Sequence, residues 1–399
     1  MIADRLALDG GSPYRETWLP FHKPCIEEDE IAEVVDTLRG GWLTTGPRAK
    51  RFEKEFAEYV GAKYAVAVNS ATAAMHLALD AIGLKPEDEV IVPAYTFTAT
   101  AEVVMYFGAK PVIVDVEPQT MTIDPAAVEA AITERTKAIM PVDLAGVPCD
   151  YEPLIEHARR NNLVVIGDSA HAIPTRYKGQ MIGTVADITA FSFYVTKPLA
   201  TGEGGMLVTD NQEWAERAQV MSLHGMSRDA WKRHTSEGSW FYEVVAPGYK
   251  YNLTDVAAAL GLRQLAKQDR FMAERLAIVE KYHAAFREIP EIEAPSDQPY
   301  GDSSWHLYLL KLNLDRLTVD RAEVIKALNA ENIGTSVHFI PLHLHPSYKE
   351  RYGFTPDSFP VAYQEYRRVI SLPIFPGMTP QDVDDVIGAV RKVVGHYRR

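Results

Sequence analysis

The sequence is poor in cysteine. Among its 399 residues only Cys25 and Cys149 occur, and their spacing fits no metal-binding motif. A disulfide framework is therefore not expected, and neither is a zinc or iron–sulfur site. We expect a protein without a bound metal that works in a reducing compartment.

Long apolar runs and excess positive charge are also missing. No run of about eighteen apolar residues occurs, as a membrane-spanning helix would need, and the N-terminal residues MIADRLALDGG lack the apolar core of a secretion signal. The net charge is -13, with 54 acidic against 41 basic side chains, which disfavours binding to nucleic acids or anionic membranes. We expect a cytoplasmic protein with no nucleic-acid or membrane partner.

Apolar segments are present in quantity, and between residues 64 and 209 they alternate between strand and helix patterns. Hydrophobic residues make up 47% of the chain, enough for a large core. The expected strands are 64–69, 89–92, 111–116, 138–143, 163–167, 188–194 and 206–209, and the expected helices between them are 72–82, 98–107, 125–133 and 153–160. Apolar strands separated by helices predict an α/β fold with a mainly parallel seven-stranded sheet flanked by helices. Ligands of such sheets bind beyond the carboxyl ends of the strands.

The remaining segments predict an arm at one end and a smaller α+β domain at the other. Residues 1–25 read as an arm, 28–38 and 48–60 as helices, and 41–47 as a loop that either binds a ligand or only connects. After them come a long bridging helix (253–287), strands at 305–313 and 335–339, a helix at 319–331 capped by Thr318, and a final helix at 380–394 capped by Thr379. We expect a large domain over residues 1–252 and a small one over 253–399.

The stretch 188–210 contains a lysine in a constrained position. Lys197 follows a buried strand, and Pro198 biases it away from helical geometry. A lysine on a rigid loop between two buried strands can lose solvation, so that its pKa falls and its amine becomes a nucleophile. The alternative is an ordinary surface lysine at the end of a strand.

Further candidate residues occur at or near the ends of predicted strands. Asp168 ends a strand, and a buried carboxylate there needs a partner such as a protonated ring nitrogen. His171 could touch the same ring, and Ser192 could reach a phosphate. The alternatives are a turn-capping aspartate, a core histidine and a small strand residue.

Another candidate is the start of a helix at residues 69–72, where Ser70 and Thr72 could bind a phosphate or simply cap the helix. Nearby, Tyr95 or Phe97 could stack on a flat cofactor, unless both belong to the core. A lysine for an aldehyde, a carboxylate for a ring nitrogen and a helix start for a phosphate together indicate pyridoxal 5'-phosphate. The glycines of TGEGG do not open a helix with dinucleotide-loop spacing.

The chain resembles the DegT/DnrJ/EryC1/StrS family of pyridoxal-phosphate-dependent sugar aminotransferases, within the fold type I group. The resemblance covers nearly the whole chain and rests on GWLTTGP, VNSATAAMHLAL, VIVPAYTFTAT, GAKPVIVDV, GDSAHA, FSFYVTKPLATGEGG, GYKYNLTDVAAALGLRQL and SLPIFPGMT. It implies that Lys197 forms the internal aldimine and that Asp168 pairs with the ring nitrogen. The further residues that it implies are His171 near the ring, Phe97 as the stacking ring, Ala71, Thr72 and Ser192 at the phosphate, and Asn252 at the phosphate of the other subunit in a homodimer with shared active sites.

The resemblance also implies an activity. Ala71 stands where glycine is commoner, and Lys197 is kept where a dehydrating branch has histidine, which favours amino transfer. L-glutamate is the expected donor, and the expected acceptor is a nucleotide-diphosphate ketosugar, with the amine entering a 4-keto group by analogy with the loop at 224–240. Thr44, Thr45 and His338 are candidate sugar or diphosphate contacts, although His338 could be purely structural. The alternatives are an aminotransferase of a cyclitol or aminobenzoate precursor and a non-catalytic cofactor-binding regulator.

Overall fold

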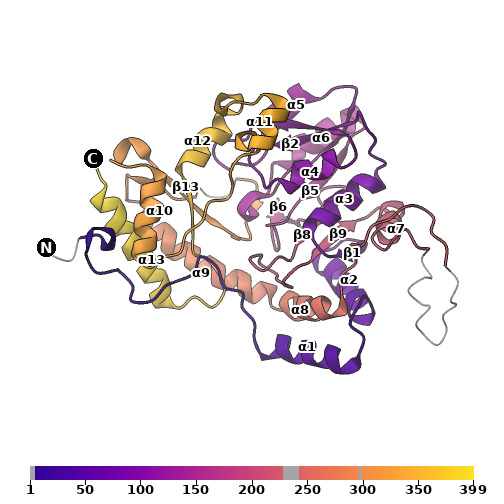
Figure 1. The fold of residues 1–399 in the computed structure, drawn as a ribbon, viewed down its shortest axis with the longest axis horizontal. Coiled ribbons are helices and arrows are strands. Elements are labelled where there is room, and N and C mark those ends of the chain that lie inside the picture. Colours follow the sequence, from indigo (N-terminus) through magenta and orange to yellow (C-terminus); the bar gives the residue numbers. More distant parts are fainter. Residues whose placement is uncertain (1–4, 228–241, 296–298) are drawn as a thin grey trace.

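A seven-stranded sheet lies at the centre of the molecule (Figure 1). The computed structural model describes residues 5–227, 242–295 and 299–399. The strand order is β1-β9-β8-β5-β4-β2-β3, and β9 runs antiparallel to both its neighbours while the other pairs are parallel. The strands are β1 (Tyr64–Val68), β2 (Glu89–Pro93), β3 (Lys110–Val114), β4 (Thr136–Ile139), β5 (Val164–Asp168), β8 (Ile188–Ser192) and β9 (Gly205–Thr209). The predicted α/β fold with a mainly parallel sheet is confirmed.

Helices cover both faces of this sheet, because its strands are apolar on both sides. Every residue of β2, β8 and β9 is buried, as expected of strands enclosed between helical layers. Ile91 faces one core and its neighbours Val90 and Val92 face the other. The first layer contains α2 (Pro47–Val60), α5 (Pro125–Ala131), α6 (Tyr151–Asn161) and α8 (Asp255–Leu265), and the second contains α3 (Ala71–Ala81), α4 (Ala99–Met105) and α7 (Gln212–Met221).

A third core lies in the C-terminal part of the chain. There a small sheet, β10-β12-β13, packs with α9, α10 and α13. The bounds are α9 (Gln268–Phe286), β10 (Ile292–Glu293), β12 (Tyr308–Leu312), α10 (Arg321–Ala330), α11 (Pro346–Tyr352), α12 (Pro360–Arg368), β13 (Val369–Leu372) and α13 (Pro380–His396). Short strands β6 (Arg176–Tyr177), β7 (Gln180–Met181) and β11 (Gly301–Asp302) form another sheet. We keep the division at residues 252 and 253 as a proposal.

Several sequence-based boundaries were wrong. The single helix expected over 253–287 is two helices, α8 and α9, interrupted at Lys267. Residues 335–339 form no strand, and only Ser336 makes an isolated bridge, to Ser371. Helix α10 is capped by Asp320, whose side chain accepts from the backbone N–H of Glu323, whereas Thr318 binds the carbonyl of Tyr397 instead. Helices α7, α11 and α12 and strand β13 were not expected.

The arm at residues 5–25 packs along the C-terminal helices, as the indigo trace in Figure 1 shows. The buried carboxylate of Glu331 accepts hydrogen bonds from the backbone N–H groups of Ala7 and Tyr14. Arg15 forms ion pairs with Asp382 and Asp385 of α13. The arm leads into α1 (Glu28–Gly40), at the edge of the molecule. None of the helices in the described ranges combines the length and hydropathy needed to cross a bilayer.

Candidate active site

The predicted site residues surround a cavity of about 390 Å³ beyond the carboxyl ends of β5 and β8. The residues that were predicted and line it are Ser70, Ala71, Thr72, Phe97, Asp168, His171, Ser192, Lys197 and His338. They come from segments as far apart in the chain as the start of α3 and the loop after α10. The parallel sheet thus gathers at one edge the groups that the sequence separates.

Lys197 lies on a tight turn after β8. Its backbone N–H donates to the carbonyl of Tyr194 at 2.8 Å, and the turn is not helical, as expected from Pro198. The carbonyl oxygens on either side are held from other elements, Val195 by His22 of the arm at 3.1 Å and Pro198 by Gln268 of α9 at 3.2 Å. The lysine side chain borders the cavity, but protein surrounds its amine, and this burial lowers the pKa of Lys197 to about 8 against the opposing effect of Asp168. Near neutral pH a useful fraction of the amine is unprotonated.

Asp168 is the last residue of β5, and its carboxylate is buried. Burial raises the pKa of Asp168, while three neighbours lower it: the hydroxyl of Thr100 at 2.7 Å, the backbone N–H of Ala170 at 3.3 Å and the ammonium of Lys197. Asp168 and Lys197 act electrostatically on each other across one cavity. The arrangement can hold a ring that offers a cationic N–H at one end and an aldehyde at the other.

The start of α3 forms another wall of the cavity. Ser70 caps the helix, since its hydroxyl accepts from the backbone N–H of Ala73 at 3.1 Å. The N–H groups of Ala71 and Thr72 precede the first intrahelical bonds, so they can bind an anion. Gly205 of β9 packs against this turn, and a Cβ there would lie 2.4 Å from the carbonyl carbon of Ser70. The hydroxyl of Ser192 lies on the same cavity.

His171 is fixed in one tautomer. Its Nδ1 lies 3.1 Å from the backbone N–H of Ala145, which can only donate, so the ring proton sits on Nε2. The backbone of Ala145 takes up a left-handed conformation, with φ of 60°, that brings this N–H to the ring. Burial and the cation of Lys197 hold the pKa of His171 well below its ordinary value. The histidine is therefore a neutral group in the wall of the cavity.

Of the two aromatic residues proposed to stack on a cofactor, Tyr95 lies in the core and Phe97 lies at the cavity. Tyr95 is completely buried in the core, whereas Phe97 lines the cavity and is 57% exposed in the single chain. The ring of Phe97 lies 5.7 Å from that of Phe339. Of the two, only Phe97 is placed to meet a flat ligand.

His338 lines the same cavity, but the other predicted substrate residues do not. Thr45 and Asn252 border a separate cavity of about 60 Å³, where the amide of Asn252 donates to the hydroxyl of Thr45 at 2.7 Å. Thr44 lines neither cavity, and its carbonyl caps α8 through the N–H of Asp255. Of the loop at 224–240, residues 228–240 lie outside the described part of the chain.

The structure adds residues that the sequence did not single out. Thr96, Tyr194, Glu203 and Phe339 also line the cavity, and Thr100 supports Asp168 from behind. Thr96 lies in the loop before α4 and Thr100 lies on α4, so helical spacing does not account for their contact. Nothing in the sequence pairs Thr100 with a carboxylate 68 residues away.

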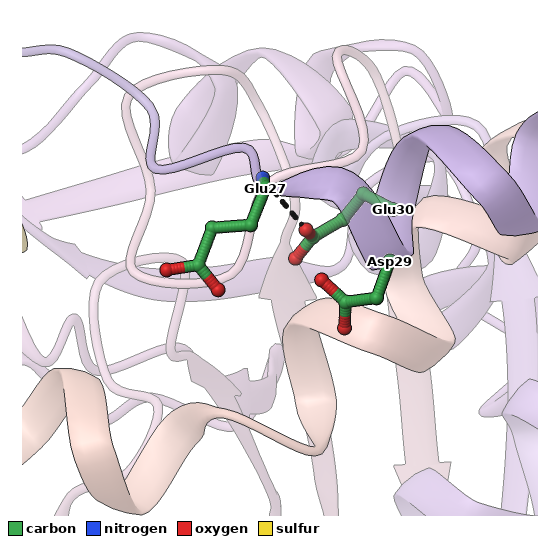
Figure 2. A group of neighbouring side chains, drawn as sticks. All are labelled: Glu27, Asp29 and Glu30. Carbon is green, nitrogen blue, oxygen red and sulfur yellow. Dashed lines mark hydrogen bonds between the residues drawn. The ribbon is translucent and has the colours of Figure 1, made fainter.

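A cluster of carboxylates outside this site resembles a metal site but is occupied by a lysine. Figure 2 shows Glu27, Asp29 and Glu30 converging at the start of α1. The ammonium of Lys267 lies 2.8, 2.5 and 2.7 Å from the carboxylates of these three residues, and Arg270 adds a second cation at Glu27. This ion-pair network also accounts for the interruption between α8 and α9, which lets Lys267 point at α1.

Comparison with known proteins agrees with this site. The profile of the DegT/DnrJ/EryC1/StrS aminotransferase family matches residues 24–391. The spore coat polysaccharide biosynthesis protein SpsC of Bacillus subtilis is 51% identical over 381 residues, which are 95% of this chain and 98% of SpsC.

Solved structures give the same result. The putative sugar aminotransferase Spr1654 of Streptococcus pneumoniae, solved in pyridoxamine- and pyridoxal-phosphate forms, superposes with a TM-score of 0.89 at 37% identity, covering 95% of this chain and 98% of the pyridoxamine-phosphate-form chain. DesI, solved in the presence of its TDP-sugar product, superposes with a TM-score of 0.87 at 28% identity, covering 99% of this chain and 97% of its own.

Fold, cavity and comparisons define a pyridoxal-phosphate-dependent aminotransferase of the fold type I architecture. The chain belongs to the DegT/DnrJ/EryC1/StrS aminotransferase family, as its sequence resemblance predicted. It is thus a sugar aminotransferase, and pyridoxal phosphate is its cofactor.

Proposed function

We propose that the protein moves an amino group from L-glutamate to a nucleotide-linked 4-ketosugar, with Lys197 and Asp168 as its catalytic residues. The observation that carries this proposal is the buried amine of Lys197, whose pKa is lowered to about 8, in one cavity with the carboxylate of Asp168 and the N-terminus of α3. These are the three contacts that an aldehyde, a ring nitrogen and a phosphate on one molecule require.

The cavity fits the cofactor. Its volume of about 390 Å³ exceeds what the groups of one pyridine ring with a phosphate need, so room is left for a substrate. Asp168 would hold the ring nitrogen, Phe97 and His171 would contact the ring, and Ser70, Ala71, Thr72 and Ser192 would bind the phosphate. When bound, pyridoxal phosphate supplies an aldehyde for amines and a ring that spreads negative charge.

Lys197 has two roles in this proposal. Its unprotonated Nζ binds the aldehyde of the cofactor, because desolvation makes the free amine available near neutral pH. Once the donor has bound, the same Nζ would accept the proton from Cα of the donor and would later donate one to the sugar carbon that receives nitrogen. Asp168 keeps the ring nitrogen charged during both transfers.

Relatives support an activated sugar as the acceptor. DesI was solved with a TDP-sugar, and SpsC takes part in polysaccharide biosynthesis. We infer that His338, at the cavity, contacts the sugar and that Thr44 and Thr45, at the loop before α2, contact the diphosphate of a substrate lying across two subunits. The proposed homodimer would bring Asn252 of one chain to the phosphate of the other, and we propose that the enzyme works in the cytoplasm.

Reductive labelling tests the lysine. The protein is incubated with pyridoxal phosphate, reduced with borohydride and digested, and we expect the mass increment of a reduced pyridoxyl phosphate group on the peptide that contains Lys197. The Lys197→Arg variant serves as the control and should remain unlabelled at this position. An increment on another lysine, or none, contradicts the assignment.

Turnover assays test the substrates. With L-glutamate we expect release of 2-oxoglutarate and, in a panel of UDP-, dTDP- and GDP-linked ketosugars, amination of a 4-keto compound. Turnover only with cyclic ketones would instead identify a cyclitol or aminobenzoate-precursor aminotransferase. Cofactor labelling without any 2-oxoglutarate would favour the regulatory alternative.

A further inference from the structure

Two buried hydroxyl groups form a chain of hydrogen bonds that ends on the carboxylate of Asp168. The hydroxyl oxygen of Thr100, on α4, lies 2.7 Å from Oδ2 of Asp168, and that of Thr96 lies 2.7 Å from Thr100. All three side chains are buried, with exposed fractions of 5% for Asp168, 1% for Thr96 and 0% for Thr100. Thr100 does not line the cavity, so it acts on a ligand only through the carboxylate.

The chemistry of the groups fixes the direction of these bonds. An ionised carboxylate only accepts hydrogen bonds, and each threonine has a single hydroxyl proton. Thr100 could give its proton to the carbonyl of Phe97 at 3.1 Å, but the shorter contact to a charged acceptor is the stronger one. Thr100 therefore donates to Asp168 and accepts from Thr96, and this chain is strongest while Asp168 is ionised.

Asp168 needs this support because its other stabilising contacts are weak or temporary. The backbone N–H of Ala170 is 3.3 Å away, a long contact. The cation of Lys197 also favours the charged carboxylate, but the same amine must be neutral to bind an aldehyde. The hydroxyl of Thr100 is present in every state of the lysine.

We propose that Thr100 is a positioning residue that keeps Asp168 ionised and aimed at the ring nitrogen of pyridoxal phosphate, with Thr96 orienting the hydroxyl of Thr100. The proposal rests on the cofactor alone and does not depend on the identity of the donor or the sugar. It deepens the role of Asp168 by naming the group that maintains its charge.

The test compares Thr100→Val with Thr100→Ser and a matched control. Thr189→Val is that control, since Thr189 lies on neighbouring β8 with a buried hydroxyl that has no hydrogen-bond partner among the described residues. Two quantities are measured for each holoenzyme: the ¹⁵N chemical shift of ring-labelled pyridoxal phosphate across pH, and the dissociation constant of the cofactor. In Thr100→Val we expect the ring nitrogen to lose its proton at lower pH and the cofactor to bind about tenfold more weakly, as loss of a hydrogen bond to a charged group implies.

Thr100→Ser should restore both properties, and Thr189→Val should match the wild-type protein. Equal behaviour of Thr100→Val and Thr189→Val overturns the proposal, and so does a failure of the serine variant to restore the nitrogen titration. Thermal unfolding of each apoprotein reports on folding. If Thr100→Val does not fold, Thr96→Val decides, because it leaves the Thr100–Asp168 pair in place: a smaller shift in the same direction supports the chain, and a wild-type titration contradicts it.

Discussion

The charge state of individual side chains decides what the cavity can do. Burial, together with nearby cations, lowers the pKa of His22 and His338 to about 4 and holds that of His306 well below its usual value. These histidines are neutral at pH 7, so they add no positive charge near Lys197, and burial is what makes the charge of Lys197 expensive to keep. The same environment that activates the amine destabilises the protonated lysine.

This tension predicts that Lys197→Met stabilises the apoprotein. Lys197 takes up its proton at about pH 8 when folded and at about 10.5 when unfolded, so below pH 8 the folded state bears the full desolvation penalty. At about 1.36 kcal/mol per pKa unit, a shift from 10.5 to about 8 should raise the free energy of unfolding at pH 7 by about 3 kcal/mol in the Lys197→Met variant. Between pH 8 and 10.5 the unfolded chain binds the extra proton, so the wild type gains stability with rising pH and the difference shrinks.

Denaturant unfolding of both apoproteins at several pH values measures the effect. Lys54→Met is the matched control, because the Lys54 side chain is 77% exposed and pairs with Glu58 at 3.8 Å. Its effect should not vary with pH over this window. If the Lys197→Met protein is less stable than the wild type at pH 7, the explanation of the lowered pKa of Lys197 is wrong.

Among the elements, the contact between β9 and the start of α3 shapes the proposed phosphate site. Gly205 opposes both Val68 and Ser192 in the sheet, next to the turn at Ser70. An added Cβ would lie 2.4 Å from the carbonyl carbon of Ser70 and 2.6 Å from the nitrogen of Ala71, and both are backbone atoms that cannot rotate away. Because Gly205 has no side chain, α3 can start directly beside this residue of β9.

We therefore expect Gly205→Ala to displace the start of α3, lower the free energy of unfolding by about 1–3 kcal/mol through overpacking and weaken cofactor binding. Gly395→Ala, near the end of α13, is the control, because nothing lies within 4 Å of its added Cβ and alanine favours helices. Unfolding curves and cofactor titrations measure the two effects. Normal cofactor affinity in Gly205→Ala would show that the helix start does not bind the phosphate.

Element boundaries were predicted best where local chemistry alone sets them. Asp124 before Pro125 and Thr379 before Pro380 begin helices as expected, each with a capping side chain bound to the first turn. The helical periodicity of apolar residues predicted one helix across Lys267, because the apolar residues of α8 and α9 continue one pattern across the break. The carboxylates that pair with Lys267 lie at the start of α1, and no local pattern contains them.

At the scale of the whole molecule, we propose that a second subunit completes the site. Thr45 and Asn252 lie together, bonded to each other, in a different cavity from Lys197 of the same chain. If each subunit lends Asn252 to the other, a site needs Lys197 from one chain and Asn252 from its partner copy.

Mixing two inactive variants tests this arrangement. Lys197→Ala and Asn252→Ala proteins should each have little activity, and unfolding and refolding them together should restore about a quarter of wild-type turnover, since half the dimers are mixed and carry one intact site of two. Each variant refolded alone is the control. No recovery in a mixture shown to contain hybrid dimers would place Asn252 in its own chain's site.

The sequence by itself determined the strands of the central sheet, their order along the chain and the residue types at their ends, because apolar runs and capping residues act locally. The tertiary structure decided which of these ends share one cavity and in what charge state. It brought Thr100 to Asp168, the N–H of Ala145 to His171 and His22 to the lysine turn. It also moved Thr45 and Asn252 away from the cavity of their own chain. Such contacts depend on long-range packing, and desolvation, which sets the pKa of Lys197, exists only once that packing has formed.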